Sequence, residues 1–207
     1  AQSLFTELGC GRVASITAPK LPKAMMPPIT PRNISGPGAG RLAMLRQRTE
    51  LVGPGRLVLT SREGHGRCRR WQEALGWSVL VQEQEAYLLP GVQGCTSFGE
   101  QLTLAPGVQL LWTPGPTPGS CVLLVRAGAV DGLFCGRLLL PTGPAALAPL
   151  RTARTFHWPR QLASLERLRS WLPAGSPDWI ASGGGLGALR GDKLVNGGAE
   201  LLAGLVF

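Results

Sequence analysis

The stretch LLWTPGPTPGSCVLL, residues 110–124, places two apolar segments on either side of a turn that contains three prolines and two glycines. Short apolar runs bounded by Pro and Gly are typical of buried β-strands. The sequence therefore predicts strands over 108–113 and 120–126, joined by a conformationally restricted loop. The next apolar run, GLFCGRLLL (132–140), predicts a strand over 132–135 that ends at Gly136.

The regions around this pair of strands alternate between strand-like and helix-like patterns. Further strands are predicted over 56–60, 78–82 and 178–182. Helices are predicted over 41–51, 65–76, 158–172 and 193–205. In the helix over 158–172, leucines and a tryptophan recur every three or four residues, which is the period of an amphipathic helix. Alternation of the two element types predicts an α/β layered core.

The N-terminal 40 residues differ in composition from the rest of the chain. Residues 15–40 contain six prolines, so this stretch can form neither a regular helix nor a central strand. The net charge is +9, and residues 1–49 contribute seven basic side chains against one acid. We therefore predict a basic, Pro/Gly-rich extended arm over 1–40 and one domain over 41–207. An arm of this kind is expected to bind other protein subunits of a complex. Nucleic acid is the less favoured partner, because no aromatic side chain between Phe5 and Trp71 could stack on a base.

Several classes of site are excluded by composition. The chain has two histidines, His65 and His157, so a site that needs three imidazoles cannot form within it. The five cysteines include no CxxC pair, which excludes a zinc ribbon or a dithiol redox motif, and Cys135 is expected to be a buried thiol in a reducing compartment. No run of about 18 apolar residues is present, so we expect no transmembrane segment.

Four segments in this order resemble the metallo-β-lactamase fold family, especially its plastid and cyanobacterial lactamase-like hydrolases. They are LVLTSREGHG (57–66), LLWTPGPTPGSCVLL (110–124), GLFCGRLLL (132–140) and DWIASGGG (178–185). The family has Thr-His-x-His-x-Asp-His, Thr-Pro-Gly-His-Thr-x-Gly, Phe-x-Gly-Asp and Gly-His-Gly at the corresponding places. The resemblance implies an αββα sandwich. Its first β layer could be incomplete, because residues 15–40 lack the alternating pattern of strands.

The chain departs from the family at the residues that would hold one or two metal ions. Aligned on Thr60, the seven ligand positions are occupied by Ser61, Glu63, His65, Gly66, Pro116, Arg137 and Gly184. Proline and glycine have no ligand side chain, and an arginine places a positive charge where a dication would sit. Only Glu63 and His65 could bind a metal, and two ligands do not make a catalytic zinc site. We therefore predict no metal ligand set, no catalytic residue and no cofactor.

The expected function is that of a pseudo-enzyme, a non-catalytic accessory or structural subunit of a larger assembly, photosynthetic or organellar. Two alternatives remain open. One is an atypical hydrolase of esters or thioesters, and the other is a module that binds an anion or small ligand through Arg137 in the former metal cleft. The resemblance implies the interior of a plastid or other organelle, with the cyanobacterial cytoplasm as the alternative.

Three structural expectations follow. Thr60, Pro116, Arg137 and Gly184 should converge around one cleft at the ends of strands. Arg137 should contact Glu63, the one acid at a family ligand position, because an unpaired buried guanidinium is costly. The segment Gly183–Ala188 satisfies G-x-G-x-x-A, but no strand and acid follow it, so we interpret it as a loop and not as a dinucleotide site.

Overall fold

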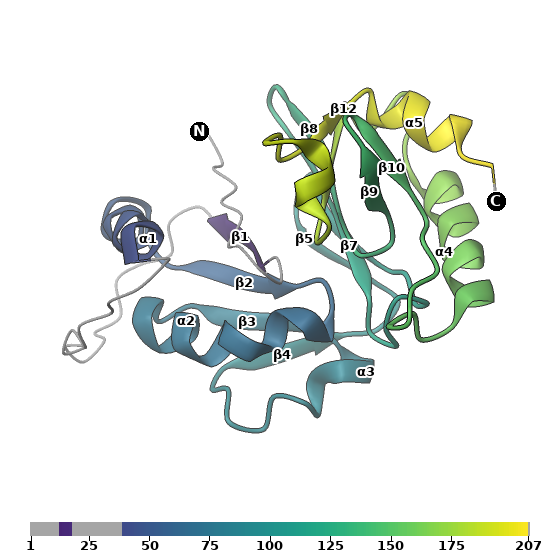
Figure 1. The fold of residues 1–207 in the computed structure, drawn as a ribbon. Helices are drawn as coiled ribbons and strands as arrows, with labels where there is room; N and C mark the ends of the chain where they lie inside the picture. Colours follow the sequence, from purple (N-terminus) through teal and green to yellow (C-terminus); the bar gives the residue numbers. More distant parts are fainter. Residues whose placement is uncertain (1–12, 18–38, 207) are drawn as a thin grey trace.

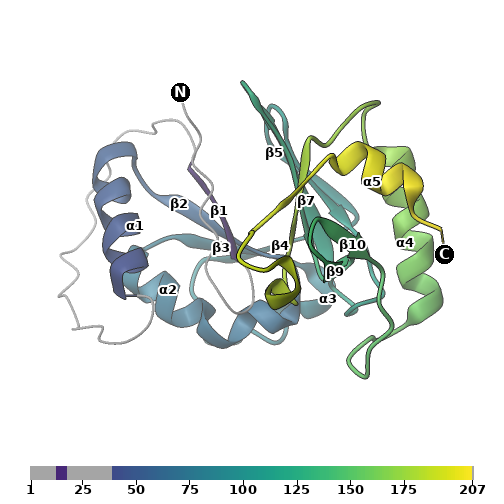
Figure 2. The same ribbon diagram turned by 45° about the horizontal axis from the view of Figure 1, so that its top comes forward.

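The computed structural model describes residues 13–17 and 39–206. Two β-sheets face each other, and helices cover the outer face of each (Figure 1). Helices α1 and α2 lie against the first sheet, whereas α4 and α5 lie against the second, and the same arrangement is visible after rotation (Figure 2). This is the αββα sandwich that the resemblance implied.

The first sheet has the strand order β1-β2-β3-β4. Its strands are β1 (Val13–Thr17), β2 (Gly55–Leu59), β3 (Ser78–Gln82) and β4 (Cys95–Phe98). Strand β1 pairs antiparallel with β2, and the other two pairings are parallel. The helices of this half are α1 (Ala39–Val52), the 3-10 helix η1 (Arg62–Arg67), α2 (Cys68–Leu75) and α3 (Glu83–Ala86).

The second sheet has six strands in the order β12-β11-β8-β7-β6-β5, with β8 and β11 parallel. They are β5 (Gln101–Ala105), β6 (Val108–Trp112), β7 (Cys121–Ala127), β8 (Val130–Gly136), β11 (Trp179–Ser182) and β12 (Val195–Asn196). A separate hairpin joins β9 (Leu140–Gly143) to β10 (Ala146–Ala148). The helices of this half are α4 (Trp158–Trp171), the 3-10 helix η2 (Leu186–Leu189) and α5 (Gly198–Gly204).

Alternation along the strands builds three apolar cores. Successive strand side chains point to opposite faces of a sheet, so Leu57 and Leu59 pack under the helices of the first half while Val58 packs between the sheets. In β7, Leu123 likewise joins the core between the sheets, and Leu124 joins the core under α4 and α5. Both faces of each central strand are therefore buried, which explains why these strands are almost continuously apolar.

Most of the predicted elements are confirmed, and the failures have two different physical reasons. The predicted helix over 193–205 is wrong at its start, because α5 begins at Gly198 after a left-handed Gly197, and Val195–Asn196 pair with β11 instead. Strands β4 and β5 were not predicted. Both are short, and about half of their side chains are exposed, so their sequences lack a continuous apolar run.

The N-terminal segment needs one correction. Val13–Thr17 fall within the predicted arm, yet they form β1 and pair with β2 from Val13 opposite Leu59 to Thr17 opposite Gly55. These five residues therefore belong to the first sheet, at its edge. Residues 1–12 and 18–38 lie outside the described residues, so the remainder of the arm stays a prediction. None of the described helices is both long enough and apolar enough to cross a bilayer.

Candidate functional site

Four loops meet at the ends of strands, as expected from the sequence. Thr60 follows β2, and its carbonyl accepts a hydrogen bond of 3.0 Å from the Cys121 amide at the start of β7. A Cβ on Gly136, at the end of β8, would lie 3.1 Å from the Thr60 Cβ. Pro116 lines the same crevice as Arg137, and a Cβ on Gly184 would lie 3.3 Å from Nη1 of Arg137. The four positions lie close together as predicted, and two of them, Pro116 and Arg137, line the crevice.

The loop between β6 and β7 is held against the start of α4. Gly115 has φ +139°, and a Cβ there would lie 2.4 Å from the backbone nitrogen of Gln161. Its carbonyl accepts a hydrogen bond of 2.9 Å from the His157 amide, and Ser164 Oγ donates to the Pro114 carbonyl at 2.7 Å. The glycine of this motif therefore has a packing role that is independent of any catalytic chemistry.

Arg137 and Glu63 form the contact predicted from the sequence. Nη1 of Arg137 donates to Oε2 of Glu63 at 2.9 Å. The two side chains are only 18% and 26% exposed, so the pair is partly shielded from water. A second guanidinium, that of Arg154, approaches the other carboxylate oxygen at 3.7 Å, although this side chain is 76% exposed. The carboxylate of Glu63 thus lies between two cations.

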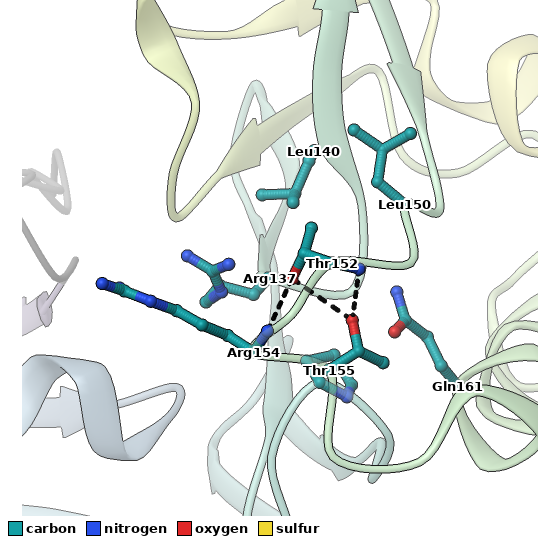
Figure 3. A pocket seen from close by; sticks show the side chains of 8 residues that line it. Arg137, Leu140, Leu150, Thr152, Arg154, Thr155 and Gln161 are labelled. Carbon is teal, nitrogen blue, oxygen red and sulfur yellow. Dashed lines mark hydrogen bonds between the residues drawn. The ribbon is translucent and has the colours of Figure 1, made fainter.

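A shallow surface crevice, too tight to enclose a water molecule, lies beside Arg137 (Figure 3). It is lined by Pro116, Arg137, Leu140, Leu150, Thr152, Arg154, Thr155 and Gln161. Thr152 and Thr155 belong to the loop before α4, where the Thr152 amide donates to Thr155 Oγ1 at 2.9 Å and the Arg154 amide to Thr152 Oγ1 at 3.3 Å. Most of the polar lining therefore comes from a loop that the sequence motifs do not include.

The residues at this centre do not fit the metal ions that the resemblance implies. Pro116 and Gly184 offer no ligand atom, and Arg137 places a cation against the one carboxylate at a ligand position. Within residues 13–17 and 39–206, no three His, Cys, Asp or Glu side chains are grouped so as to hold a metal ion. The donor set is therefore unsuitable for a catalytic zinc or iron. That the protein binds no metal and catalyses no reaction stays a prediction.

His65 belongs to a different environment from Glu63. Its Nε2 is buried and has no hydrogen-bond partner among the described residues. Burial lowers the pKa of His65 below its ordinary value of 6.5, with Glu85 opposing this shift and Arg62 adding to it. Glu85, which is 1% exposed, accepts a 3.0 Å hydrogen bond from the Gly119 amide. The charge of Glu85 therefore acts on His65, and no hydrogen bond or ion pair joins His65 to the Arg137–Glu63 pair in the described part of the chain.

The lowered pKa of His65 predicts a loss of stability in mild acid. The unfolded chain takes up a proton at the ordinary value of 6.5, whereas the folded protein resists protonation until a lower pH. The contribution of His65 is therefore complete above pH 6.5 and is lost as the pH falls through 6.5 towards the folded pKa. Urea unfolding between pH 8 and pH 5 should show a smaller acid loss in His65→Gln than in the unaltered protein. Both proteins contain His157, so its effect cancels in the comparison. An equal acid loss of stability in the unaltered protein and in His65→Gln would contradict the prediction.

Sequence reasoning missed three residues that build this region: Glu85, Arg154 and Gln161. Glu85 follows strand β3, and its burial against Gly119 depends on a hydrogen bond between residues 34 positions apart. The other two lie outside the four motifs. The two glycines in TPGPTPG were one available signal. A glycine often marks a place where another part of the protein packs closely against the backbone, as Gln161 does at Gly115 and Glu85 does at Gly119.

The remaining expectations concern a loop and a thiol. Gly183 donates a backbone hydrogen bond to the Gly136 carbonyl, so the glycine-rich segment closes against the end of β8, and its turn η2 is four residues long. This supports the interpretation as a loop. Cys135 is fully buried in β8, as predicted. Burial also raises the pKa of the Cys121 thiol, and it raises that of Cys68 to about 11.

Comparison with known proteins shows the fold. No family model and no curated protein sequence matches the chain. Among solved structures, it is similar to the BLEG-1 B3 metallo-β-lactamase, with a TM-score of 0.60, 19% identity and 96% of each chain covered. It is also similar to TTHA1623, solved in a di-iron-bound form, with a TM-score of 0.57, 20% identity and 95% of this chain and 96% of that chain covered. The chain therefore has the metallo-β-lactamase fold.

Proposed function

We propose that this chain is a non-hydrolytic protein of metallo-β-lactamase fold, in which an ion pair takes the place of the metal centre. The observation that carries the proposal is the 2.9 Å contact between Arg137 and Glu63 at two ligand positions. A guanidinium at that place repels a dication and also occupies the carboxylate that would bind it. The same arrangement supplies no activated water, so metal-assisted hydrolysis has no nucleophile here.

A hydrolase is the second candidate, and the name of one similar structure suggests it. The BLEG-1 protein is named a lactamase, and a lactamase is a hydrolase. An ester or thioester hydrolase built on this chain would have to use groups other than the family's ligands. At 19% identity the likeness carries over the fold and not the chemistry.

Metal analysis of the purified full chain separates the two candidates. We expect substoichiometric zinc and iron after expression in medium supplemented with both metals, and no hydrolysis of ester, thioester or lactam substrates. We also expect Arg137→Asp to bind zinc no better than the unaltered protein. That change adds one carboxylate, but Pro116 and Gly184 still lack donor atoms and Arg154 remains beside Glu63.

The control for this experiment is Arg70→Asp, which makes the same change of charge at an exposed position on α2. Stoichiometric metal in the unaltered protein, together with hydrolysis that is abolished by a chelator, would overturn the proposal. Tight zinc binding by Arg137→Asp alone would show that the ligand set is one substitution from completion.

The role as an accessory subunit is part of the proposal and is supported by the basic N-terminal composition. We propose binding to other protein subunits through this segment, in a plastid, another organelle or a cyanobacterial cytoplasm. A chain that begins at Val13 keeps β1, whereas one that begins at Ala39 lacks it and the intervening residues. Affinity purification from native extracts should recover the same partners with the full chain and lose them with the chain that begins at Ala39. Equal recovery of partners by the full chain and by the chain that begins at Ala39 would show that the N-terminal segment does not mediate the binding.

A further inference from the structure

The loop before α4, residues 150–157, carries positive charge that its surroundings do not balance. Residues 132–165 contain four arginines and no acid, and two of these arginines, Arg151 and Arg154, lie in the loop. A third, Arg160, lies in the first turn of α4. All three side chains are exposed. Neither Arg151 nor Arg160 forms a salt bridge with a described residue.

The parts of the chain outside the described residues do not supply the missing negative charge. Residues 1–12 and 18–38 contain four basic side chains and one acidic side chain, that of Glu7. A second copy of the chain is repelled, because each copy has a net charge of +9. A partner that balances these arginines is therefore a different molecule of acidic character.

We propose that an acidic segment of a partner protein docks on this surface. The docking residues, here called the arginine surface, are three arginines and the aromatic residue that lies among them in the sequence: Arg151, Arg154, Phe156 and Arg160. The inference goes beyond the proposed function, because it uses a surface other than the N-terminal segment and does not require the loss of the metal centre. It also specifies the chemistry of the partner, since a guanidinium binds a carboxylate through two parallel N–H donors.

The backbone of the loop is held in place by hydrogen bonds. The Thr155 amide donates to the Thr152 carbonyl at 3.0 Å, which closes a turn between two of the docking residues. The amides of Phe156 and His157 donate to carbonyls of the loop between β6 and β7 at 3.1 and 2.9 Å. A loop that is already ordered loses little conformational entropy on binding, so its contacts with a partner are not offset by that cost.

Phe156 provides an apolar contact among the arginines. Its side chain is 51% exposed, and the centroid of its ring lies 6.3 Å from that of His157. His157 is fixed in turn, because its Nδ1 accepts a hydrogen bond of 3.1 Å from the Arg160 amide. Aromatic and arginine side chains are enriched in protein interfaces. A single aromatic residue does not offer the series of stacking platforms that single-stranded nucleic acids use, so a protein segment is the favoured occupant.

The shape of the neighbouring crevice also favours a macromolecule over a small ligand. The crevice does not enclose even a water molecule, so a partner has to bind on the surface beside it. The guanidiniums of Arg137 and Arg154 extend to the same side of the loop in Figure 3. Arg154 approaches Glu63 at 3.7 Å, whereas Arg137 does so at 2.9 Å. Most of the five N–H donors of Arg154 are therefore available to a carboxylate of the partner.

Fluorescence anisotropy of a labelled acidic peptide, titrated with the full chain, tests the proposal. The peptide has about ten residues, with glutamates on both sides of a Leu-Phe pair. A peptide with glutamines in place of the glutamates and a labelled oligouridylate of similar length are measured in parallel. We expect the acidic peptide to bind and the glutamine peptide to bind at least about tenfold more weakly. The affinity for the acidic peptide should fall as the salt concentration rises from about 50 to about 200 mM.

Three variants and one control locate the site. Arg151→Glu and Arg160→Glu should each weaken binding of the acidic peptide about fivefold or more, because repulsion replaces attraction. Phe156→Ala should weaken it by a similar factor of about five while keeping the net charge. Arg70→Glu makes the same change of charge on the exposed side of α2 and should alter the affinity less than about twofold. All four side chains are exposed, so the variants should fold, which circular dichroism checks.

Three outcomes would overturn the inference. One is no binding of the acidic peptide at the lower salt concentration. Another is equal binding by the three variants and by Arg70→Glu, which would show that binding follows net charge alone. The third is tighter binding of the oligouridylate than of the acidic peptide, lost in the same three variants, which would make the surface a nucleic-acid site. None of these outcomes changes the metal content, so failure of the proposed function is recognised separately, by metal analysis.

Discussion

Replacing Gly115 with alanine should lower the free energy of unfolding by about 3 kcal/mol or more, since backbone strain and overpacking each cost about 1–3 kcal/mol. Gly115 has φ +139°, where a side chain is strained. A Cβ would also lie 2.4 Å from the Gln161 backbone, which cannot move without displacing α4. Urea unfolding followed by circular dichroism, with the slope compared between proteins, measures the change.

Gly128→Ala is the matched control. Gly128 also has positive φ, at +62°, but a Cβ there meets nothing within 4 Å. In this variant the free energy of unfolding should fall only by the cost of placing alanine at positive φ, about 1–2 kcal/mol. If the two alanine variants are equally destabilised, the close approach of the loop to α4 contributes nothing, and the packing role assigned to this motif is wrong.

Replacing Glu85 with alanine should cost about 2–4 kcal/mol, because the buried Gly119 amide loses its acceptor and the removed side chain leaves a cavity. The carboxylate is 1% exposed and accepts the amide at 3.0 Å. A Cβ on Gly119 would lie 2.6 Å from the Glu85 Cγ, so the side chain lies tightly against this loop. Loss of Glu85 should therefore loosen the loop that carries Pro116, which hydrogen exchange of the amides between β6 and β7 would detect.

Two controls separate the hydrogen bond from helix effects. Glu85→Gln keeps an acceptor of nearly the same size and should change stability by less than about 1 kcal/mol. Glu83→Ala removes an exposed acid from the same short helix and should have little effect. A loss in Glu85→Gln as large as that in Glu85→Ala would show that the charge, and not the acceptor, is what stabilises the loop.

The sequence was informative where a residue's surroundings follow from its own neighbours. Apolar runs predicted the buried strands, and β3 has the predicted bounds, 78–82. The convergence of Thr60, Pro116, Arg137 and Gly184 was predictable because each follows a strand in a recognisable motif. The Arg137–Glu63 contact was predictable because a partly buried guanidinium needs a partner and Glu63 is the one acid at a family ligand position.

The rest depended on tertiary contacts that leave no local pattern. Arg154 reaches Glu63 across 91 positions of sequence, and Gln161 is buried because α4 approaches Gly115. The edge strands β4 and β5 have mixed exposure and weak periodicity. The start of α5 was set by β12 pairing with β11, which overrode the helical preference of the segment.

The ion pair also determines how a designer could install a metal in this scaffold. Glu63→His alone would leave Arg137 partly buried next to Arg154 with no anion between them. Arg137→Asp alone would set two carboxylates together with only the exposed Arg154 to balance them. Each single exchange therefore passes through a less stable protein, and only simultaneous replacement, with donors also supplied at Pro116 and Gly184, avoids that barrier. Libraries built one residue at a time on this chain would be expected to lose folded protein before they gain a binding site.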